Sequence, residues 1–280
     1  MLHLRVLDFN ANLHAVQEAA DLLWQRRALL FEMARRELTD RYAGQALGSA
    51  WAIIAPTLLM ATYLFTFTFI FKGRLGADDS GAGYMAYVLA GLVPWLGLQD
   101  GLSRASMAIV GSSNLVKQIV FPGEILPMKV TLATLPGLLI GLVAAIALAA
   151  IAGRLSLFGL FILLPIAVFF YLIMLAGFSY FLASFGVFLR DTKDLVAFFL
   201  SVGLFLHPVL FPPGAAPAWL NYIFYASPFS HMIWCFRDAL IGPELHYSWS
   251  WLVFPIVSVV VFLLGWRTFR MLKPSFGNVL

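Results

Sequence analysis

Long apolar stretches without charged residues constrain this chain more than any other feature. Residues 51–71 contain no Asp, Glu, Lys or Arg and begin at a tryptophan. About 20 mostly apolar residues are enough for an α-helix to cross the hydrocarbon core of a membrane. Similar stretches recur through the 280 residues, of which 61 % are hydrophobic and only 11 % charged, whereas soluble domains carry about 25 % charged residues. The composition argues against a soluble enzyme and predicts an all-α membrane protein.

Six such stretches are predicted to span the membrane, and polar segments such as the charged turn at residues 190–194 separate them. The second stretch differs from the others because Asp100 and Arg104 interrupt its later half. The predicted spans are residues 51–71, 84–109, 125–151, 155–189, 195–211 and 249–266. The transmembrane domain is therefore expected to cover residues 51–271, followed by a cytoplasmic tail at residues 272–280.

The distribution of basic residues predicts the orientation of these spans. An even number of spans places both termini on the same side of the membrane. With the N-terminus inside, most of the 18 Lys and Arg residues lie in cytoplasmic segments, as the positive-inside rule requires. The outside keeps only Lys72, Arg74, Arg154 and Arg237. Because the basic residues cluster beside apolar stretches, the net charge of +4 indicates membrane orientation and not nucleic-acid binding.

The region before the first span, residues 1–50, is predicted to be cytoplasmic. It has no apolar segment typical of a cleavable signal peptide. Leucines recur at helical spacing between residues 22 and 30, with arginines on the other faces. This pattern predicts an amphipathic helix in the membrane interface, or a solvated helix packed on a partner. The basic residues expected to meet lipid headgroups are Arg35, Arg36 and Arg41.

Residues 212–248, between the fifth and sixth spans, are too rich in aromatic residues for an ordinary loop. Pro217 and Pro228 divide the segment into pieces that are too short to cross the membrane. The segment is predicted to form short re-entrant helices on the periplasmic side, provided that other helices bury their ends. The alternative is a pair of helices lying flat in the membrane interface.

Short motifs follow one another in a definite order between about Trp24 and Ile241. In chain order they are Arg36-Glu37-Leu38, Arg41-Tyr42, Gly44, Leu47-Gly48, Trp51, Pro56, Gly91-Leu92-Val93-Pro94-Trp95, Asn114-Leu115-Val116-Lys117, Phe121-Pro122-Gly123-Glu124-Ile125-Leu126-Pro127, Arg190-Asp191, Pro208-Val209, Ser227-Pro228 and Arg237-Asp238. Their order and spacing resemble the membrane (permease) subunit of bacterial ABC-type polysaccharide exporters, a type-2 ABC exporter fold. That family exports O-antigen, capsule or teichoic acid chains built on a lipid or lipid-like carrier. His207 departs from the family pattern, which has a small hydroxyl residue at this position.

The resemblance implies an ATP-driven exporter of lipid-linked polysaccharide, with O-antigen favoured, in the bacterial inner membrane. It also implies a homodimer that works with two copies of a separate ABC ATPase subunit. The chain has no G-x-x-x-x-G-K-[ST] motif to cradle nucleotide phosphates, so it is expected to bind no cofactor, and ATP and Mg belong to the partner. The two copies are expected to approach along the first and fifth spans, at the small residues Gly48, Ala52 and Gly203.

The cytoplasmic loop at residues 112–124 is the candidate for coupling to the ATPase, because the resemblance places a coupling helix there. A serine or asparagine at residues 112–114 can cap a short helix, and Pro122 would end it. The residues expected to meet the ATPase are Asn114, Leu115, Lys117, Ile119, Val120 and Glu124. The alternative is a plain hydrophilic connector.

Aromatic rings and small hydroxyl groups at helical spacing are the candidates for a polysaccharide channel. Sugar rings stack on aromatic side chains, and their hydroxyl groups exchange hydrogen bonds with polar side chains. Such residues lie one turn apart in the first span and at similar spacing in the fifth. They are Thr62, Tyr63, Thr66, Phe67, Phe198, Ser201 and Phe205. The same stripes are typical of helix-packing faces, and the sequence does not decide between the two.

Ionisable groups inside membrane segments are costly, so each is expected to have a partner or a function. Asp100 and Arg104 lie one helical turn apart and are expected to pair, with a gating role as the alternative. Arg237 and Asp238 either pair within the re-entrant segment or contact the exported glycan near the periplasmic exit. His207 either titrates near neutral pH or serves as a hydrogen-bonding residue.

Other functions are disfavoured by features that the sequence lacks. An ABC exporter of a small hydrophobic substrate such as a drug or haem shares the mechanism and is the main alternative. A membrane-embedded enzyme needs converging carboxylates or histidines, whereas the acids predicted outside are widely spread. A secondary transporter usually shows internal repeats, and none is evident in the sequence. The single cysteine, Cys235, excludes a disulfide within the chain, and no Cys/His spacing indicates a metal site.

Overall fold

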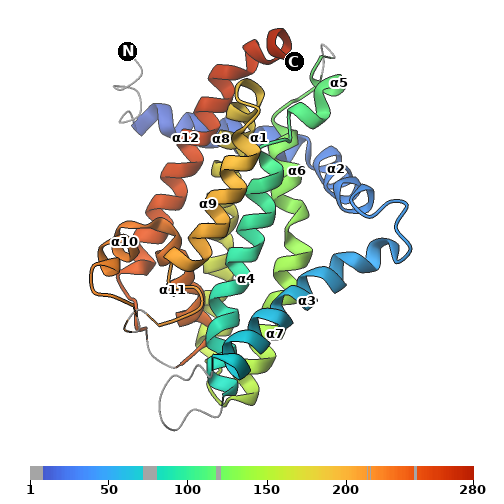
Figure 1. The fold of residues 1–280 in the computed structure, drawn as a ribbon. Helices are drawn as coiled ribbons and strands as arrows, with labels where there is room; N and C mark the ends of the chain where they lie inside the picture. Colours follow the sequence, from blue (N-terminus) through green and yellow to red (C-terminus); the bar gives the residue numbers. More distant parts are fainter. Residues whose placement is uncertain (1–8, 72–80, 118–120, 213, 215, 243–244) are drawn as a thin grey trace.

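The computed structural model of the protein describes the whole chain except residues 1–8, 72–80, 118–120, 213, 215 and 243–244, and for residues 9–13 it describes the backbone. Within this part of the chain every regular element is a helix (Figure 1). The α-helices are α1 (Phe9–Gln25), α2 (Arg27–Asp40), α3 (Trp51–Phe65), α4 (Ala82–Ala105), α5 (Ser113–Val116), α6 (Ile125–Ala133), α7 (Leu135–Ile151), α8 (Leu164–Phe188), α9 (Thr192–Leu206), α10 (Leu220–Ala226), α11 (Pro228–Leu240) and α12 (Ser250–Val279). Shorter 3-10 or π turns are η1 (Gly48–Ala50), η2 (Thr66–Ile70), η3 (Val110–Ser112) and η4 (Gly159–Leu163).

Four helical stretches in the described chain are long and apolar enough to cross a membrane. They are Gly48–Ile70, Ile125–Ile151, Gly159–Phe188 and Ser250–Val279, and they correspond to the first, third, fourth and sixth predicted spans. The second and fifth predicted spans correspond to α4 and α9. Neither helix is among the four stretches: α9 has only 15 residues, and α4, with 24 residues, is long enough but less apolar.

The most extensive helix pair in the bundle is formed by α8 and α12. Their backbones approach closely at Gly177 of α8, where an added Cβ would lie 2.5 Å from the Cα of Phe262 in α12. Small residues at a crossing allow two membrane helices to approach in this way. The helix α4 is largely buried among α7, α8, α9 and α11, with Trp95 fully enclosed. The core of the molecule therefore surrounds α4 and α8.

The helix α3 lies on the outside of this bundle and packs against α4 and α7 (Figure 1). Within α3, all of which is described, only Met60 is buried. Large apolar side chains on its other faces are exposed, including Leu58 and Phe65. An exposed apolar surface of this extent needs lipid or another protein chain to cover it.

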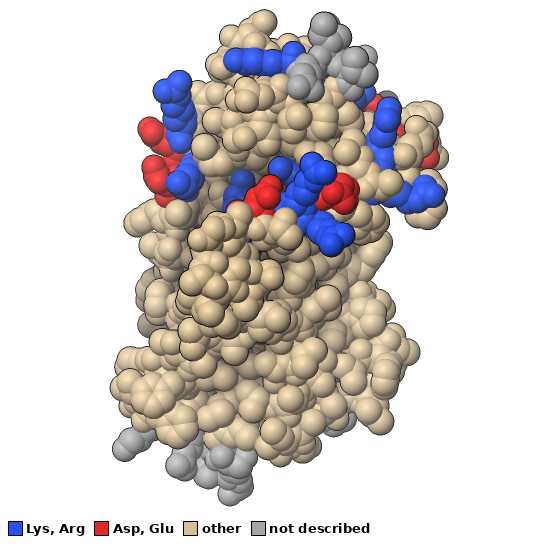
Figure 2. All heavy atoms as spheres, turned by 90° about the vertical axis from the view of Figure 1, so that its right-hand side faces the viewer, with Lys and Arg blue, Asp and Glu red and all other residues tan. Residues whose placement is uncertain are grey.

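Charged side chains gather towards one end of the molecule. Figure 2 shows the face that lies at the right-hand side of Figure 1: charged side chains extend across its upper part, while the described surface below them is free of Lys, Arg, Asp and Glu. In Figure 1 this upper end holds α1, α2, α5 and the C-terminal end of α12. A wide uncharged band next to a charged end is the surface expected of a membrane-embedded protein.

The C-terminal helix extends further than the apolar pattern predicted. The sixth span was expected to end at Trp266 and to be followed by a tail at residues 272–280, but α12 continues to Val279. Phe269 and Phe276 are buried in a second apolar cluster with Tyr180 of α8. The helix continues past its first charged residues because Phe269 and Phe276 still pack in this buried cluster.

The segment at residues 212–248 forms the short helix α10 and the buried helix α11. Every residue of α11 from Phe229 to Leu240 is buried, and the helix packs against α4, α8, α12 and η4. This burial shows that the rest of the bundle covers α11, and the choice between re-entrant helices and helices lying flat in the interface stays a prediction. By contrast α10 keeps Tyr222 82 % exposed. Pro228 occupies the first turn of α11, where its missing N–H costs nothing.

Candidate functional site

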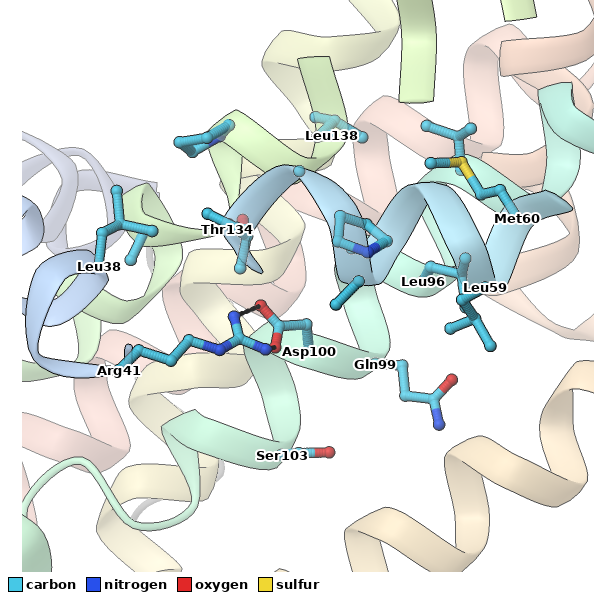
Figure 3. A pocket seen from close by; sticks show the side chains of 18 of the residues that line it. Leu38, Arg41, Leu59, Met60, Leu96, Gln99, Asp100, Ser103, Thr134 and Leu138 are labelled. Carbon is cyan, nitrogen blue, oxygen red and sulfur yellow. Dashed lines mark hydrogen bonds and ion pairs between the residues drawn. The ribbon is translucent and has the colours of Figure 1, made fainter. Parts of the chain in front are cut away.

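A cavity of about 350 Å³ lies between α2, α3, α4 and the junction of α6 and α7. Figure 3 shows its two parts. One part is apolar and includes Leu59, Met60, Leu96 and Leu138, while the other is polar and includes Arg41, Gln99, Asp100, Ser103 and Thr134. We refer to it as the α2 cavity.

The polar side of the α2 cavity is lined by Arg41 and Asp100, and Arg104, which does not line the cavity, also pairs with Asp100. Arg41 donates to Asp100 from both terminal nitrogens, at 2.9 Å to Oδ1 and 3.2 Å to Oδ2. Arg104 pairs with the same carboxylate from one turn further along α4. The predicted Asp100–Arg104 pair is therefore present, and Arg41 joins it from 59 residues away. Two cations around one anion give this group of three residues a net positive charge, and Arg41 and Asp100 are the members that line the cavity.

Two further contacts hold α2 against the bundle. Glu37 of α2 forms an ion pair with Lys129 of α6 at 2.9 Å, and Leu30 and Ala34 are buried. Phe31, on a face of α2 beside the buried one, is exposed, a feature typical of an interface helix. The predicted headgroup residues Arg35 and Arg36 are also exposed, and Arg36 pairs only with the exposed Glu32 of its own helix among the described residues.

The predicted coupling loop is partly described. It begins with η3 and the single-turn helix α5, which lie at the charged end of the molecule (Figure 1). Asn114 and Lys117 are exposed, whereas Leu115 is half-buried against the apolar cluster of Phe269 and Phe276. Two other residues of the prediction, Ile119 and Val120, lie outside the described residues.

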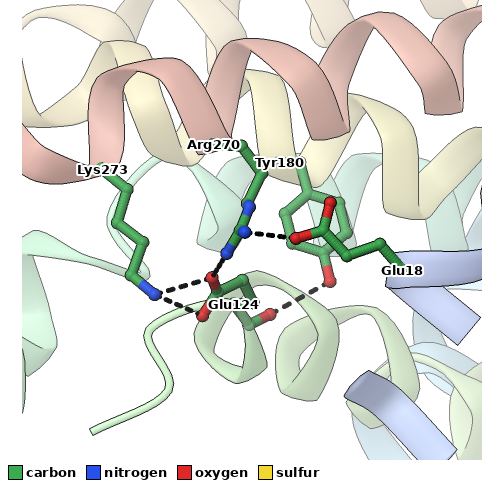
Figure 4. A network of polar contacts seen from close by, with 5 residues as sticks. All are labelled: Glu18, Glu124, Tyr180, Arg270 and Lys273. Carbon is green, nitrogen blue, oxygen red and sulfur yellow. Dashed lines mark hydrogen bonds and ion pairs between the residues drawn. The ribbon is translucent and has the colours of Figure 1, made fainter. Parts of the chain in front are cut away.

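Glu124, at the end of this loop, differs from the prediction that it meets a partner. Its side chain is only 1 % exposed and accepts hydrogen bonds from Lys273 (2.6 and 2.8 Å) and Arg270 (2.7 Å) of α12 (Figure 4). Burial alone would raise the pKa of the Glu124 carboxyl, but these hydrogen bonds outweigh it and hold the pKa below its usual range. The charge of Glu124 is thus neutralised inside the chain.

The predicted channel residues are divided between packed and exposed positions. In α9, Phe198 and Phe205 are 69 % and 58 % exposed. In the first span, Tyr63 and Phe67 are half-buried and pack against the main core. The hydroxyl groups of Thr62 and Ser201 donate to carbonyl groups one turn earlier in their own helices. Thr66 lies in η2 and is half-buried, as Tyr63 and Phe67 are.

Arg237 and Asp238 are both buried, and they contact different groups. The Arg237 guanidinium donates to the carbonyl of Val209 at 2.7 Å and lies 3.7 Å above the ring of Tyr87. Asp238 accepts from the backbone N–H groups of His246 and Tyr247 and from the indole of Trp251. The two neighbours therefore have separate partners and do not form the ion pair that was one of the two expectations, while a contact with the exported glycan stays a prediction.

His207 is a hydrogen-bonded histidine at the end of α9. Its Nδ1 lies 2.8 Å from the carbonyl of Gly203, and its Nε2 lies 2.7 Å from the hydroxyl of Ser227. Gly203 itself faces Trp95, because an added Cβ would lie 2.8 Å from that ring. The small size of Gly203 is thus needed inside one chain, which removes one argument for close approach of a second copy there.

Sequence reasoning missed the ion pairs that join distant helices. Arg41–Asp100, Glu37–Lys129 and Glu124–Lys273 each connect residues far apart in the chain. The sequence already placed these groups near the ends of their helices on one side of the membrane. It did not show which helices are neighbours, and that choice determines which charges meet.

Comparisons with known proteins agree with this architecture. The model of the ABC-2 type transporter family matches residues 28–241, which include the α2 cavity and α11. The chain is also 28 % identical over 190 residues to the O-antigen export system permease protein RfbA of Myxococcus xanthus. That alignment covers 68 % of this chain and 70 % of the relative.

Proposed function

Because the chain belongs to the ABC-2 type transporter family, we propose that it is the transmembrane subunit of an ATP-driven exporter of lipid-linked polysaccharide. A relative named as an O-antigen export permease supports a glycan substrate, with O-antigen favoured over capsule or teichoic acid. The chain is a transport subunit, and ATP hydrolysis occurs on a separate ATPase with its own ATP and Mg.

The observation that carries this proposal is the composition of the α2 cavity. Its apolar part is continuous with the outer apolar surface through Leu59 of α3. Its polar part is lined by Arg41 and Asp100, and Arg104 adds a second positive charge next to Asp100. A lipid-linked glycan has a matching arrangement, with a phosphate-bearing head attached to an apolar chain. Guanidinium groups suit phosphate oxygens because they form paired, charge-assisted hydrogen bonds.

The assembly that we propose contains two copies of this chain and two ATPase subunits. The exposed apolar faces of α3 and α9 offer a surface for the second copy, and their aromatic side chains would line a conduit between the copies. The loop around α5 reaches the charged end of the molecule, where a cytoplasmic ATPase can bind. Six spans, with cytoplasmic termini and α10–α11 re-entering from the periplasmic side of the inner membrane, complete the proposed topology.

The test is ATPase stimulation in proteoliposomes that contain the chain and its ATPase. We expect hydrolysis to rise with a polyprenyl-pyrophosphate-linked glycan and not with the same glycan free of lipid. Arg41→Gln should raise the half-stimulating concentration by about fivefold, since a partly exposed charge contributes about 1 kcal/mol. The control is Arg190→Gln, which removes an exposed guanidinium away from the α2 cavity.

Two outcomes would contradict the proposal. Stimulation by small hydrophobic compounds, with none by the lipid-linked glycan, would favour the drug or haem exporter. An equal effect of Arg41→Gln and Arg190→Gln would remove the α2 cavity from the proposed path of the headgroup.

A further inference from the structure

Five polar residues from four elements meet at the charged end of the bundle (Figure 4). We call them the Glu124 cluster, and they are Glu18, Glu124, Tyr180, Arg270 and Lys273. Glu18 belongs to α1, Glu124 precedes α6, Tyr180 lies in α8, and both basic residues lie in the extension of α12 beyond its apolar part. The cluster therefore joins the loop at 112–124 to helices that are distant in the sequence.

The charges in the cluster depend on one another. Lys273 contacts both carboxylate oxygens of Glu124, and Arg270 bridges Glu124 to Glu18. The two negative and two positive charges neutralise one another only while α1, the loop before α6 and α12 stay in contact. Because the Glu124 carboxylate is buried, separating it from α12 would leave a charge away from water without a partner, which is strongly unfavourable.

The attachment of the cluster to the membrane helices is rigid. Tyr180 donates from its hydroxyl to the backbone carbonyl of Glu124 at 3.0 Å, so α8 holds the same residue from another side. Further along, α8 and α12 pack backbone to backbone at Gly177 and Gly265. A displacement of Glu124 is thus passed to a helix pair that cannot easily separate.

We propose that Glu124 is a positioning residue for coupling: through Arg270 and Lys273 it makes the loop before α6 move together with α12 and α1. This inference rests on the proposed function, since it concerns how movement of the ATPase reaches the membrane helices. The exposed part of the loop contacts the ATPase, and the buried Glu124 carries the displacement inward. The extension of α12 is thereby part of the coupling apparatus and not a passive tail.

Distance measurements on the complex with the ATPase test the rigid connection directly. Spin labels are placed with Gly111→Cys, an exposed position with open space around it, and Ser275→Cys on the exposed face of α12. The native Cys235 is buried and does not compete for the label. We expect the same distance distribution without nucleotide and with trapped ATP, and a shifted or broadened one after Glu124→Gln. A distribution that Glu124→Gln leaves unchanged would overturn the inference.

Transport measurements test the consequence for coupling. Glu124→Gln should lower the glycan exported per ATP hydrolysed by about fivefold or more, the lower range of coupling between distant sites. Lys273→Arg keeps the positive charge and should leave the glycan exported per ATP unchanged. Lys273→Gln removes the charge and should lower the glycan exported per ATP. If Glu124→Gln does not fold, Lys273→Gln serves as the test. Glu32→Gln is the matched control, because it removes an exposed carboxylate that pairs with Arg36 of its own helix, outside the Glu124 cluster.

The outcomes separate this inference from the proposed function. If Glu32→Gln lowers the glycan exported per ATP as much as Glu124→Gln does, the loss does not depend on the Glu124 cluster and the inference is wrong. If the native complex hydrolyses ATP but moves no lipid-linked glycan, the proposed function fails, and the spin-label distances still decide whether Glu124 connects the loop to α12.

Discussion

The crossing of α8 and α12 at Gly177 offers the sharpest test of the fold. Replacing Gly177 by Ala adds a Cβ that would lie 2.5 Å from both the Cα and the N of Phe262, whereas ordinary van der Waals contact begins at 3.4 Å. Both neighbouring atoms belong to the backbone, so no side chain can rotate away. The two helices must separate by about 1 Å, and a gap of this size forfeits about a quarter to a half of the dispersion energy of the atoms that face it.

The expected cost of Gly177→Ala is about 2–3 kcal/mol, the upper range for adding one carbon to a packed core. The assay is equilibrium unfolding of the purified chain in mixed micelles with increasing SDS, followed by tryptophan fluorescence. The control is Gly277→Ala in α12, where an added Cβ meets nothing within 4 Å. That variant should be neutral or stabilised by up to about 1 kcal/mol, because alanine is the better helix former. Equal stabilities of the two variants would refute the close backbone packing of α8 and α12.

Three further predictions concern transport and pH. Tyr63→Ala combined with Phe67→Ala should abolish surface polysaccharide while ATP hydrolysis continues without response to glycan; normal export would assign both residues to packing alone. Ile119→Asp combined with Val120→Asp should uncouple hydrolysis from export without unfolding the membrane domain, and an unchanged export rate would exclude residues 114–124 from coupling. The lowered pKa of Glu124 stabilises the folded chain at pH values above the ordinary carboxyl value of 4.5 and loses this effect as the pH falls through the lowered pKa. The native chain should therefore lose stability in acid by more than the Glu124→Gln variant does, measured as unfolding midpoints between pH 7 and pH 3.

The sequence by itself determined the class of the protein and the places of most helices. The apolar stretches at residues 51–71 and 125–151 agree with helices to within a few residues at each end. This success has a simple physical reason. In hydrocarbon, every backbone N–H and C=O group must be hydrogen-bonded within the protein, and a single apolar stretch of about 20 residues achieves this by itself as an α-helix.

The ends of α12 and the path of α11 could not be derived in this way. The extension of α12 depends on Phe276 finding an apolar surface on α8, and the burial of α11 depends on the space left between α4, α8 and α12. Both are properties of the packed bundle and not of the local sequence. Hydropathy predicts which segments can cross the membrane. It does not predict how far a helix continues beyond the membrane when its side chains pack against other helices.

The charged residues of the candidate site were also predicted only in part from the sequence. The sequence identified Arg41, Asp100 and Glu124 as charged groups near the ends of membrane helices, and it predicted the local pair of Asp100 with Arg104, which is one helical turn away. Only the tertiary structure decided that Arg41 joins that pair and that Glu124 faces α12 instead of a partner. Contacts within one helix follow from its 3.6-residue period, whereas contacts between helices depend on which neighbours the close packing of the whole bundle brings together.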